Sequence, residues 1–514
     1  MALTQPRCLH RGLGEIMPTS QFALGHMVRL FGVLAVVTMA VSSAHAGSLV
    51  IRNSSDAAIT CSVDGYTMAT GWPFDWTITV EAGKSFVVGP SYEQEKPVID
   101  WADCGGLKTS HMAITPDGPD GYFYFTGTQS RVLNAALYPY LPNLPGGTFN
   151  AMVQHVIETY QTENPDVLLN AVLNGNLDIY SYEGLTRLLG ADGFDIMELD
   201  MLYLQFLADS DLILPTEMPL DNYQDIGLAA VTAGGNQAYG VPSWLCMDFT
   251  FSFAEGVKAV TSLEGLSVFL SDTPEDQTPL VGNFNGSWRL PAMYISGYMG
   301  QFPDAPIANA LQMPPNDTVI TNLTTLTEKC NFDDGNKCID DTYHDAANGT
   351  TEQVLATGRA KTDVGFSEQS FYIKLYGGPE PLWAIGTPWG NTINPLLYTD
   401  AFVRSAANCA DDPCKTDGQA FIALMTSDPM KTFITQSQDL DDHAPYRRLL
   451  TATKSFYELP WVKEDALYTQ FHTVFETGAS FPNNITDEQQ TSIGTQVCAA
   501  LKAQNPAYVC KSEP

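Results

Sequence analysis

Basic residues are scarce in this chain. Its 514 residues include 25 lysines and arginines against 58 aspartates and glutamates, which gives a formal net charge of −33. A field of this sign repels nucleic acid and anionic membranes and gathers cations. We therefore expect no nucleic-acid or membrane partner, and a cationic small molecule is easier to accept than a phosphorylated one. A generally acidic, soluble secreted protein would carry the same charge without any such ligand.

Long apolar runs are also missing, except for one near the start. Leu30–Val41 is apolar, basic residues precede it, and Ala44-His-Ala46 follows it with small residues that a signal peptidase accepts. The run is shorter than the roughly 20 residues that a membrane span needs, so a membrane anchor is the weaker alternative. We predict a signal peptide over 1–46 and a secreted, soluble mature protein.

Asn-x-Ser/Thr triplets are present in the mature part of the chain. Such triplets accept N-linked glycans only where the host glycosylates, and they favour surface positions and a eukaryotic secretory route. The six asparagines are Asn53, Asn285, Asn316, Asn322, Asn348 and Asn484.

Unpaired cysteine is rare. Of the 10 cysteines, Cys8 lies in the predicted signal segment and Cys246 has no obvious partner. A leftover thiol in a secreted protein is buried and inert, cross-linked to another chain, or chemically employed. The other eight form close sequential pairs, as expected in an oxidising compartment: Cys61 with Cys104, Cys330 with Cys338, Cys409 with Cys414, and Cys498 with Cys510.

Length and local texture predict more than one domain, since the mature chain is too long for one simple core. Residues 47–130 contain short alternating runs broken by turns, which predict a small β-sandwich-like domain that Cys61 and Cys104 could staple. The expected strands are Ser48–Arg52, Trp76–Val80, Ser85–Val88 and Tyr122–Thr126.

Strands and helices alternate from Arg131 onward. Val132–Leu137, an amphipathic stretch over Phe149–Tyr160 and Val167–Val172 predict a β-α-β unit with a parallel sheet. The alternation predicts an α/β fold of two lobes over 131–514. Lobe 1 would cover about 131–245 and 385–450, lobe 2 about 246–384, and C-terminal helices 451–514. Further expected elements are helices over Tyr182–Leu189, Glu352–Gly358 and Gln419–Phe433, and strands over Phe194–Asp200, Tyr239–Pro242, Lys361–Phe366 and Pro381–Ile385.

Polar and reactive side chains follow several of these strands. In open α/β sheets, ligands bind outside the carboxyl ends of the strands. The residues at such positions are Tyr138, Tyr140, Asp200, Cys246 and Glu368. We therefore expect them to face one shared site.

The ordered set of motifs around these residues resembles thiaminase I (thiamine pyridinylase). The resemblance runs from Arg131 to the C-terminus and implies a two-lobed, periplasmic-binding-protein-like (type II) fold with its site between the lobes. The motifs are Leu137-Tyr-Pro-Tyr-Leu-Pro142, Asp195-Ile-Met-Glu-Leu-Asp200, Tyr239-Gly-Val-Pro-x-x-x-Cys246, Gly365-Phe-Ser-Glu368 and Tyr398-Thr-Asp400.

The resemblance implies roles for single residues. Cys246 would be the nucleophile and Glu368 the general base, and no metal or organic cofactor is implied. The second pocket aspartate is Asp195 or Asp200; we prefer Asp200, because the carboxyl end of its strand faces the site. Phe366 stands where the resemblance predicts a tyrosine. The implied substrate-binding residues are Tyr138, Tyr140, Tyr180, Asp200, Tyr398 and Asp400.

The implied activity is cleavage of thiamine by displacement of its thiazole with an amine or thiol co-substrate, through a covalent cysteine adduct, in a monomer. The main alternative is a non-catalytic extracellular protein that binds thiamine or another cation. A papain-like cysteine protease would need a histidine partner, for which His155, His344, His443 and His472 are available.

Single site residues also have plainer interpretations. Tyr138 and Tyr140 could be half-buried aromatics at a strand end, and Glu368 could be an exposed loop residue. Asp200 could cap a helix that begins at Met201, and Asp400 could cap a helix of its own. The site hypothesis therefore depends on the set, with the unpaired cysteine at its centre.

Overall fold

The computed structural model describes residues 47–67, 71–88, 97–109, 120–330, 335–344 and 346–510. The predicted signal peptide, with Cys8, lies outside these residues. Within the described part of the chain, every helix is too short or too polar to cross a membrane.

The first part of the described chain forms two sheets around one core. The sheets have the orders β4-β1-β7 and β3-β2-β5-β6, and Cys61 on β2 pairs directly with Cys104 on β5 as a disulfide. The four predicted strands are confirmed. β2 was not predicted, because its segment contains polar residues and a glycine, which weaken the pattern of a strand. The strands are β1 (Leu49–Asn53), β2 (Ile59–Thr67), β3 (Pro73–Val80), β4 (Ser85–Val88), β5 (Pro97–Cys104), β6 (Leu107–Lys108) and β7 (Gly121–Phe125).

A larger sheet follows, with the order β20-β14-β19-β10-β8-β9. β8 pairs in parallel with β9 and with β10, which confirms the predicted β-α-β unit around α1 (Asn150–Glu163). β19 lies between β10 and β14 and is antiparallel to both. The strands are β8 (Arg131–Leu137), β9 (Val167–Leu173), β10 (Ile196–Asp200), β14 (Gly240–Cys246), β19 (Leu396–Ser405) and β20 (Leu450–Thr451), with β11 (Ile213–Leu214) and β21 (Ala479–Ser480) paired to β19.

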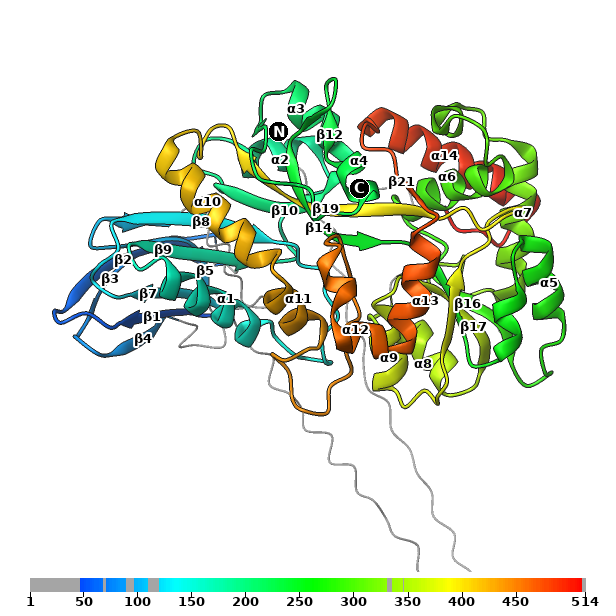
Figure 1. The fold of residues 1–514 in the computed structure, drawn as a ribbon, viewed down its shortest axis with the longest axis horizontal. Helices are drawn as coiled ribbons and strands as arrows, with labels where there is room; N and C mark the ends of the chain where they lie inside the picture. Colours follow the sequence, from blue (N-terminus) through cyan, green and yellow to red (C-terminus); the bar gives the residue numbers. More distant parts are fainter. Residues whose placement is uncertain are drawn as a thin grey trace, which may run out of the picture. The chain divides into compact units, whose positions relative to one another are not determined.

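A smaller sheet has the order β16-β17-β15-β18. Its strands are β15 (Phe249–Ser252), β16 (Thr278–Gly282), β17 (Ala360–Gly365) and β18 (Trp383–Gly386). The last long helix of the chain, α14 (Asp487–Gln504), returns to this part of the molecule and packs on α6 (Arg289–Gln301) and α7 (Asp317–Thr327) (Figure 1).

The chain passes between the two sheets at defined points. It leaves the larger sheet after β14 and enters the smaller one at β15, and it returns between β18 and β19. Cys246 is the last residue of β14, and Tyr398 is the third residue of β19. Both residues therefore lie where the chain passes from one sheet to the other.

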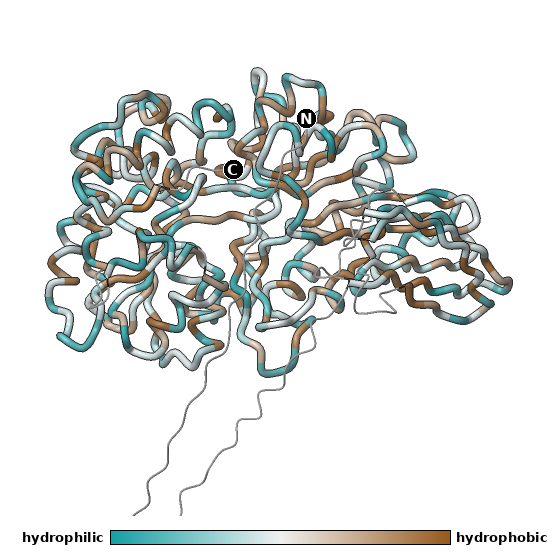
Figure 2. The backbone as a smooth tube through the Cα atoms, turned by 180° about the vertical axis from the view of Figure 1, so that it is seen from behind, coloured by the Kyte–Doolittle hydropathy of each residue, from teal (hydrophilic) through white to brown (hydrophobic). Residues whose placement is uncertain are grey.

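Apolar side chains fill the interiors of the layers. Most strands of both sheets are buried along their length, and the hydrophobic stretches run through them while many outer loops are hydrophilic (Figure 2).

The remaining elements are α2 (Tyr182–Leu189), η1 (Met201–Tyr203), α3 (Leu204–Asp209), α4 (Asp225–Ala230), β12 (Thr232–Ala233), β13 (Gln237–Ala238), η2 (Glu255–Ala259), α5 (Leu263–Ser271), η3 (Ile307–Leu311), η4 (Glu328–Cys330), α8 (Thr350–Ala356), α9 (Gln369–Leu375), α10 (Asp412–Met425), α11 (Asp428–Thr435), η5 (Ser455–Glu458), α12 (Pro460–Glu464) and α13 (Ala466–Phe475).

One predicted helix is two helices in the structure. The segment Gln419–Phe433 divides into the end of α10 and most of α11. The Ser427 side chain accepts a hydrogen bond from the Met430 N–H, and Pro429 lies in the first turn of α11. A capping serine and an early proline both favour the start of a new helix, so local capping overrode the continuous apolar period.

The glycan acceptors do not all lie on the surface, which corrects the sequence-based expectation. Asn53 and Asn285 are buried, and their side-chain amides donate hydrogen bonds inside the fold, to Val80 O (2.9 Å) and Val509 O (2.8 Å). Among the six asparagines, Asn348 and Asn484 are exposed. A glycan on either of these two would not have to displace buried side chains.

Candidate active site

Four residues named from the sequence lie on one face of the larger sheet. On β10 and β19, Asp200 is paired with Asp400, and on β14 and β19, Cys246 is paired with Tyr398. Paired residues of antiparallel strands share a face, as do residues two apart on one strand. Asp400 and Tyr398 are two residues apart on β19 and so share a face. Their partners, Asp200 and Cys246, therefore lie on that same face of the sheet.

Asp400 lies inside a strand, so the expectation that it caps a helix is wrong. Its neighbours on both sides are strands of the same sheet, and only 3% of the residue is exposed. The segment Leu396–Ser405 is rich in aromatic and β-branched residues, which favour a strand. A buried carboxyl in a central strand is costly unless other groups compensate it, which is typical of a functional position.

The three candidate tyrosines lie together beside this face. The hydroxyl groups of Tyr138 and Tyr180 are 3.0 Å apart, and the Tyr140 ring lies 5.3 Å from the Tyr138 ring and 6.0 Å from the Tyr180 ring. Burial and the nearby Asp400 raise the pKa of the Tyr138 hydroxyl, so it stays protonated and can donate a hydrogen bond. Tyr140 is 48% exposed. The tyrosines thus offer two protected hydroxyl groups and one accessible ring.

Glu368 lies in the turn between β17 of the smaller sheet and α9, and it is half-buried, so it is not a fully exposed loop residue. One carboxylate oxygen accepts a hydrogen bond from the Ser367 hydroxyl (3.2 Å). Burial raises the pKa of Glu368 to about 7. A carboxyl group with this pKa exchanges its proton at neutral pH, as a general base must.

Cys246 remains a free thiol, while the eight other mature cysteines form the four predicted disulfides. Burial raises the pKa of the thiol well above its usual value. The carboxylates Glu368, Asp400, Asp200 and Asp248, in that order, raise it further. These acids come from both sheets and from the segment that joins them, and all of them act on the same thiol. The thiol is therefore protonated at neutral pH and needs a base in order to react.

Within the described part of the chain, the largest electrostatic influences on Cys246 include no histidine of the kind that a papain-like protease needs. His155 stacks on Phe433, with ring centroids 4.0 Å apart, and His472 contacts Glu476 at 3.4 Å. The largest electrostatic influences on the thiol are carboxylates instead. This arrangement favours a carboxylate base over an imidazole.

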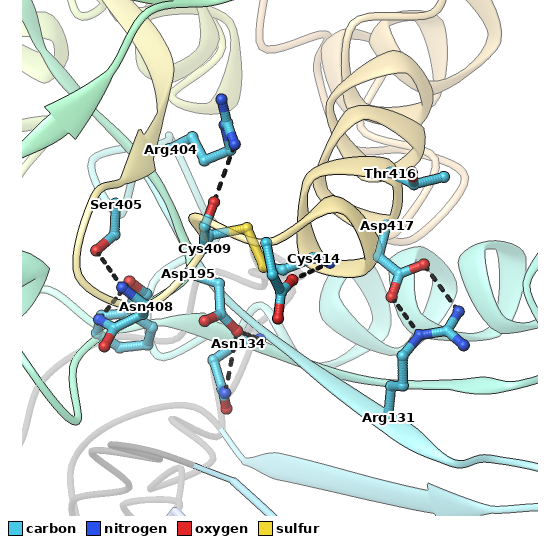
Figure 3. Close-up of a disulfide and its surroundings, with 12 residues drawn as sticks. Arg131, Asn134, Asp195, Arg404, Ser405, Asn408, Cys409, Cys414, Thr416 and Asp417 are labelled. Atoms are coloured by element: carbon cyan, nitrogen blue, oxygen red, sulfur yellow. Dashed lines mark hydrogen bonds and ion pairs between the residues drawn. A yellow bond between two sulfur atoms is a disulfide. The ribbon is translucent and has the colours of Figure 1, made fainter.

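Asp195 and Asp200 lie at opposite ends of one β-strand segment. The Asp195 carboxylate accepts hydrogen bonds from the Asn134 backbone N–H (2.7 Å) and side-chain amide (3.2 Å), close to the disulfide of Cys409 and Cys414 (Figure 3). Asp200 instead neighbours the acids and tyrosines of the candidate site. The structure thus favours Asp200 as the pocket aspartate.

The alternative that Asp200 caps a helix at Met201 is confirmed, while its role in a pocket stays a prediction. Its carboxylate accepts a hydrogen bond from the Leu202 N–H (3.2 Å) at the start of η1. Asp200 also raises the pKa of Asp400, which faces it across the strands. The two roles are compatible, because one carboxylate has two oxygens.

Phe366 lies at the edge of the site. Its ring is 6.2 Å from the Tyr398 ring, and the Arg289 guanidinium lies 5.8 Å from its centre. Arg289 also forms a buried ion pair of 2.6 Å with Asp248, two residues after Cys246. Where the resemblance predicts a tyrosine hydroxyl, this chain therefore has an apolar ring beside a paired cation.

Sequence reasoning missed five charged or polar residues near the site. Glu198 had a signal, since it lies two residues before Asp200 on the same strand. Asp248 and Ser243 flank Cys246 within its motif. Lys431 and Arg289 had none, because each lies in a helix far along the chain from the residue that it contacts, Ser243 for Lys431 and Asp248 for Arg289.

Comparisons with known proteins place this geometry in context. No family model and no curated protein matches the chain. Among solved structures, thiaminase I from Bacillus thiaminolyticus is 20% identical with a TM-score of 0.55, covering 72% of this chain and 99% of that one. Clostridium botulinum thiaminase I in complex with thiamin is 16% identical with a TM-score of 0.56 and the same coverage.

A sugar receptor has the same fold. The acarbose-binding GacH receptor of Streptomyces glaucescens is 14% identical with a TM-score of 0.53, covering 73% of this chain and 95% of that one. At identities this low, such likenesses establish the fold alone. The chain therefore has the two-lobed α/β fold that thiaminase I structures share with periplasmic binding proteins.

Proposed function

We propose that this protein is a secreted thiaminase I-like transferase. It would cleave thiamine by displacing the thiazole from the pyrimidine methylene with an amine or thiol, and Cys246 would be the nucleophile. The observation that carries the proposal is a free thiol whose pKa is raised by carboxylates from both sheets, in a fold shared with a thiaminase I that was solved with thiamin.

The first half of the reaction forms a bond to sulfur. As the Cys246 sulfur adds to an electron-poor carbon of the pyrimidine ring, its proton passes to Glu368. The bond between the methylene and the thiazole nitrogen then breaks, and the thiazole leaves with the bonding electrons. Covalent catalysis thus divides one difficult displacement into two easier ones.

The second half reverses the sulfur bond. The amine or thiol attacks the methylene, the sulfur–carbon bond breaks, and the ring regains its aromatic electrons. Glu368 returns its proton to the departing sulfur and takes the proton of the incoming nucleophile. No external oxidant or reductant is needed.

The charge of the substrate suits the acid cluster. Free Cys246 is held protonated by burial and by nearby carboxylates. A cationic thiazolium among Asp200, Asp400 and Glu368 would offset those negative charges, so the same cation that binds also makes the thiol easier to deprotonate. The Tyr140 ring, which is accessible, would stack on a flat ring of the substrate for about 0.5–1 kcal/mol.

The four disulfides support the secreted location. We further propose that the protein acts as a monomer and needs no cofactor.

The test is a turnover assay of the mature protein with thiamine, with and without an added amine or thiol. We expect thiamine to disappear only when a nucleophile is present, with equal amounts of free thiazole and pyrimidine–nucleophile product. Mass spectrometry identifies both products. Tight binding of thiamine without any loss would instead establish the alternative, an extracellular solute-binding protein, which the GacH likeness also allows.

A further inference from the structure

Lys431 is a completely buried lysine in α11, with 0% of its surface exposed. Buried ammonium groups are rare, because removal from water costs several kcal/mol unless other charges compensate. Its Nζ donates a hydrogen bond to the Ser243 hydroxyl (2.6 Å) and lies 3.2 Å from the centre of the Trp244 ring. Both partners belong to β14, the strand that ends at Cys246.

Ser243 connects Lys431 to a buried carboxylate. The Ser243 hydroxyl donates a hydrogen bond to one oxygen of Glu198, and the other oxygen accepts one from the Tyr138 backbone N–H (3.1 Å). The chain of contacts therefore runs from Lys431 through Ser243 and Glu198 to Tyr138. It joins α11, β14, β10 and the end of β8, which carry three of the candidate site residues.

Ser243 is also the irregular residue of its strand. Pro242 pairs with Ala401 and Trp244 pairs with Asp400, so Ser243 is the extra residue of a β-bulge. A bulge turns the side chains that follow it and is common beside active sites. Cys246 lies three residues further on, so the contacts of Ser243 help to fix where the thiol points.

The charges around Lys431 come from two strands. Glu198 on β10 and Asp400 on β19 are the groups that favour its charged form, while burial lowers its pKa. In return, Lys431 lowers the pKa of both carboxyl groups. Asp400 also faces Asp200, Glu198 and Glu368, all of which raise its pKa. Lys431 is thus a cation that opposes the mutual repulsion of these acids.

We propose that Lys431 is a positioning residue of the active site. It balances the acids Glu198 and Asp400, and through Ser243 it holds the bulge that directs Cys246. This inference rests on the proposed thiamine-cleaving function, because Asp400, one of the acids that Lys431 balances, is a residue that the proposal assigns to the cationic substrate.

The test compares the wild-type protein with Lys431→Met, Glu198→Gln and the double variant. The first measurement is the urea midpoint of unfolding in mildly acidic buffer, where Lys431 is charged. We expect each single variant to lower the midpoint, because it leaves one buried charge without its partner. The double variant removes both charges and should recover at least half of the loss.

The second measurement is the pH profile of thiamine affinity, 1/Kd, in which we assign the acidic limb to Asp400. Removal of a cation that lowers the pKa of Asp400 raises that pKa, so the acidic limb of Lys431→Met should move to higher pH by about one unit. Glu198→Gln removes an anion that raises the same pKa, so the limb of the double variant should move back toward lower pH. A lysine that served only for packing would lower the affinity without moving the limb.

The outcomes separate this inference from the proposed function. Failure of the wild-type protein to cleave thiamine would refute the function, and the urea cycle would still decide the pairing of Lys431 with Glu198. The inference would be overturned if the losses in urea midpoint of the two single variants simply added up in the double variant. It would also be overturned if Lys431→Met folded but its acidic limb stayed at the wild-type pH. If Lys431→Met does not fold but the double variant does, charge pairing is supported. Failure of both to fold would overturn it, because no charge then remains to be balanced.

Discussion

A Cys246→Ser variant should lose thiamine cleavage by more than about 10³-fold while its fold stays intact. A serine hydroxyl is far less acidic than a thiol, and the groups that act most strongly on Cys246 are carboxylates, which are weak bases toward a hydroxyl. Sulfur and oxygen differ little in size, and Cys246 has no disulfide to lose. Turnover by stopped assay, thermal midpoint and thiamine affinity are the measurements.

The matched control is Met247→Leu. Met247 is the next residue and is buried, with 1% of its surface exposed. Methionine and leucine are close in volume, so this change should cost less than about 1.5 kcal/mol and keep most of the activity. Full turnover by Cys246→Ser, with the control also active, would mean that the thiol is an inert wall of the pocket.

A Glu368→Gln variant should lower kcat by about 10²–10⁴-fold, the usual contribution of a general base. Burial raises the pKa of Glu368 to about 7. The basic form is the deprotonated one, so kcat/KM of the wild-type protein should rise as the pH increases through about 7. Glutamine has no proton to lose there, and the corresponding limb should be missing from the profile of the variant.

Glu264→Gln serves as the control for this prediction, because Glu264 is an exposed glutamate in α5. It should keep both the rate and the pH profile of the wild-type protein. Thiamine binding by Glu368→Gln should weaken only modestly, since Asp200 and Asp400 remain. If Glu368→Gln keeps the wild-type kcat, or if its kcat/KM still rises with pH as that of the wild-type protein does, then Glu368 is not the general base.

Much of the larger sheet could be predicted from the sequence because its signals are local. α2 begins and ends at the predicted residues, Tyr182 and Leu189, since the Ser181 side chain caps its first turn and Gly190 follows its last residue. The strands of the β-α-β unit are short apolar runs between turn residues. Cys246 was recognisable because every other mature cysteine had a neighbour along the chain.

The errors concern features that only tertiary contacts decide. Asp400 looked like a helix cap, but pairing with β10 and β14 makes its segment a central strand. Lys431 was not singled out from the sequence, because its hydrogen-bond partner, Ser243, is 188 residues away in the chain. The domain boundaries and the roles of the site residues remain predictions.

The most direct measurement is the mass of the denatured wild-type protein after incubation with thiamine alone. Without a second nucleophile, the reaction should stop after the first half, and we expect the protein mass to rise by one pyrimidinylmethyl group. Peptide mapping should locate that group on Cys246, and the Cys246→Ser variant should gain nothing. Two results would contradict covalent catalysis by this thiol. One is an unchanged protein mass after incubation with thiamine alone, although the same protein consumes thiamine once an amine is added. The other is an adduct on any residue other than Cys246.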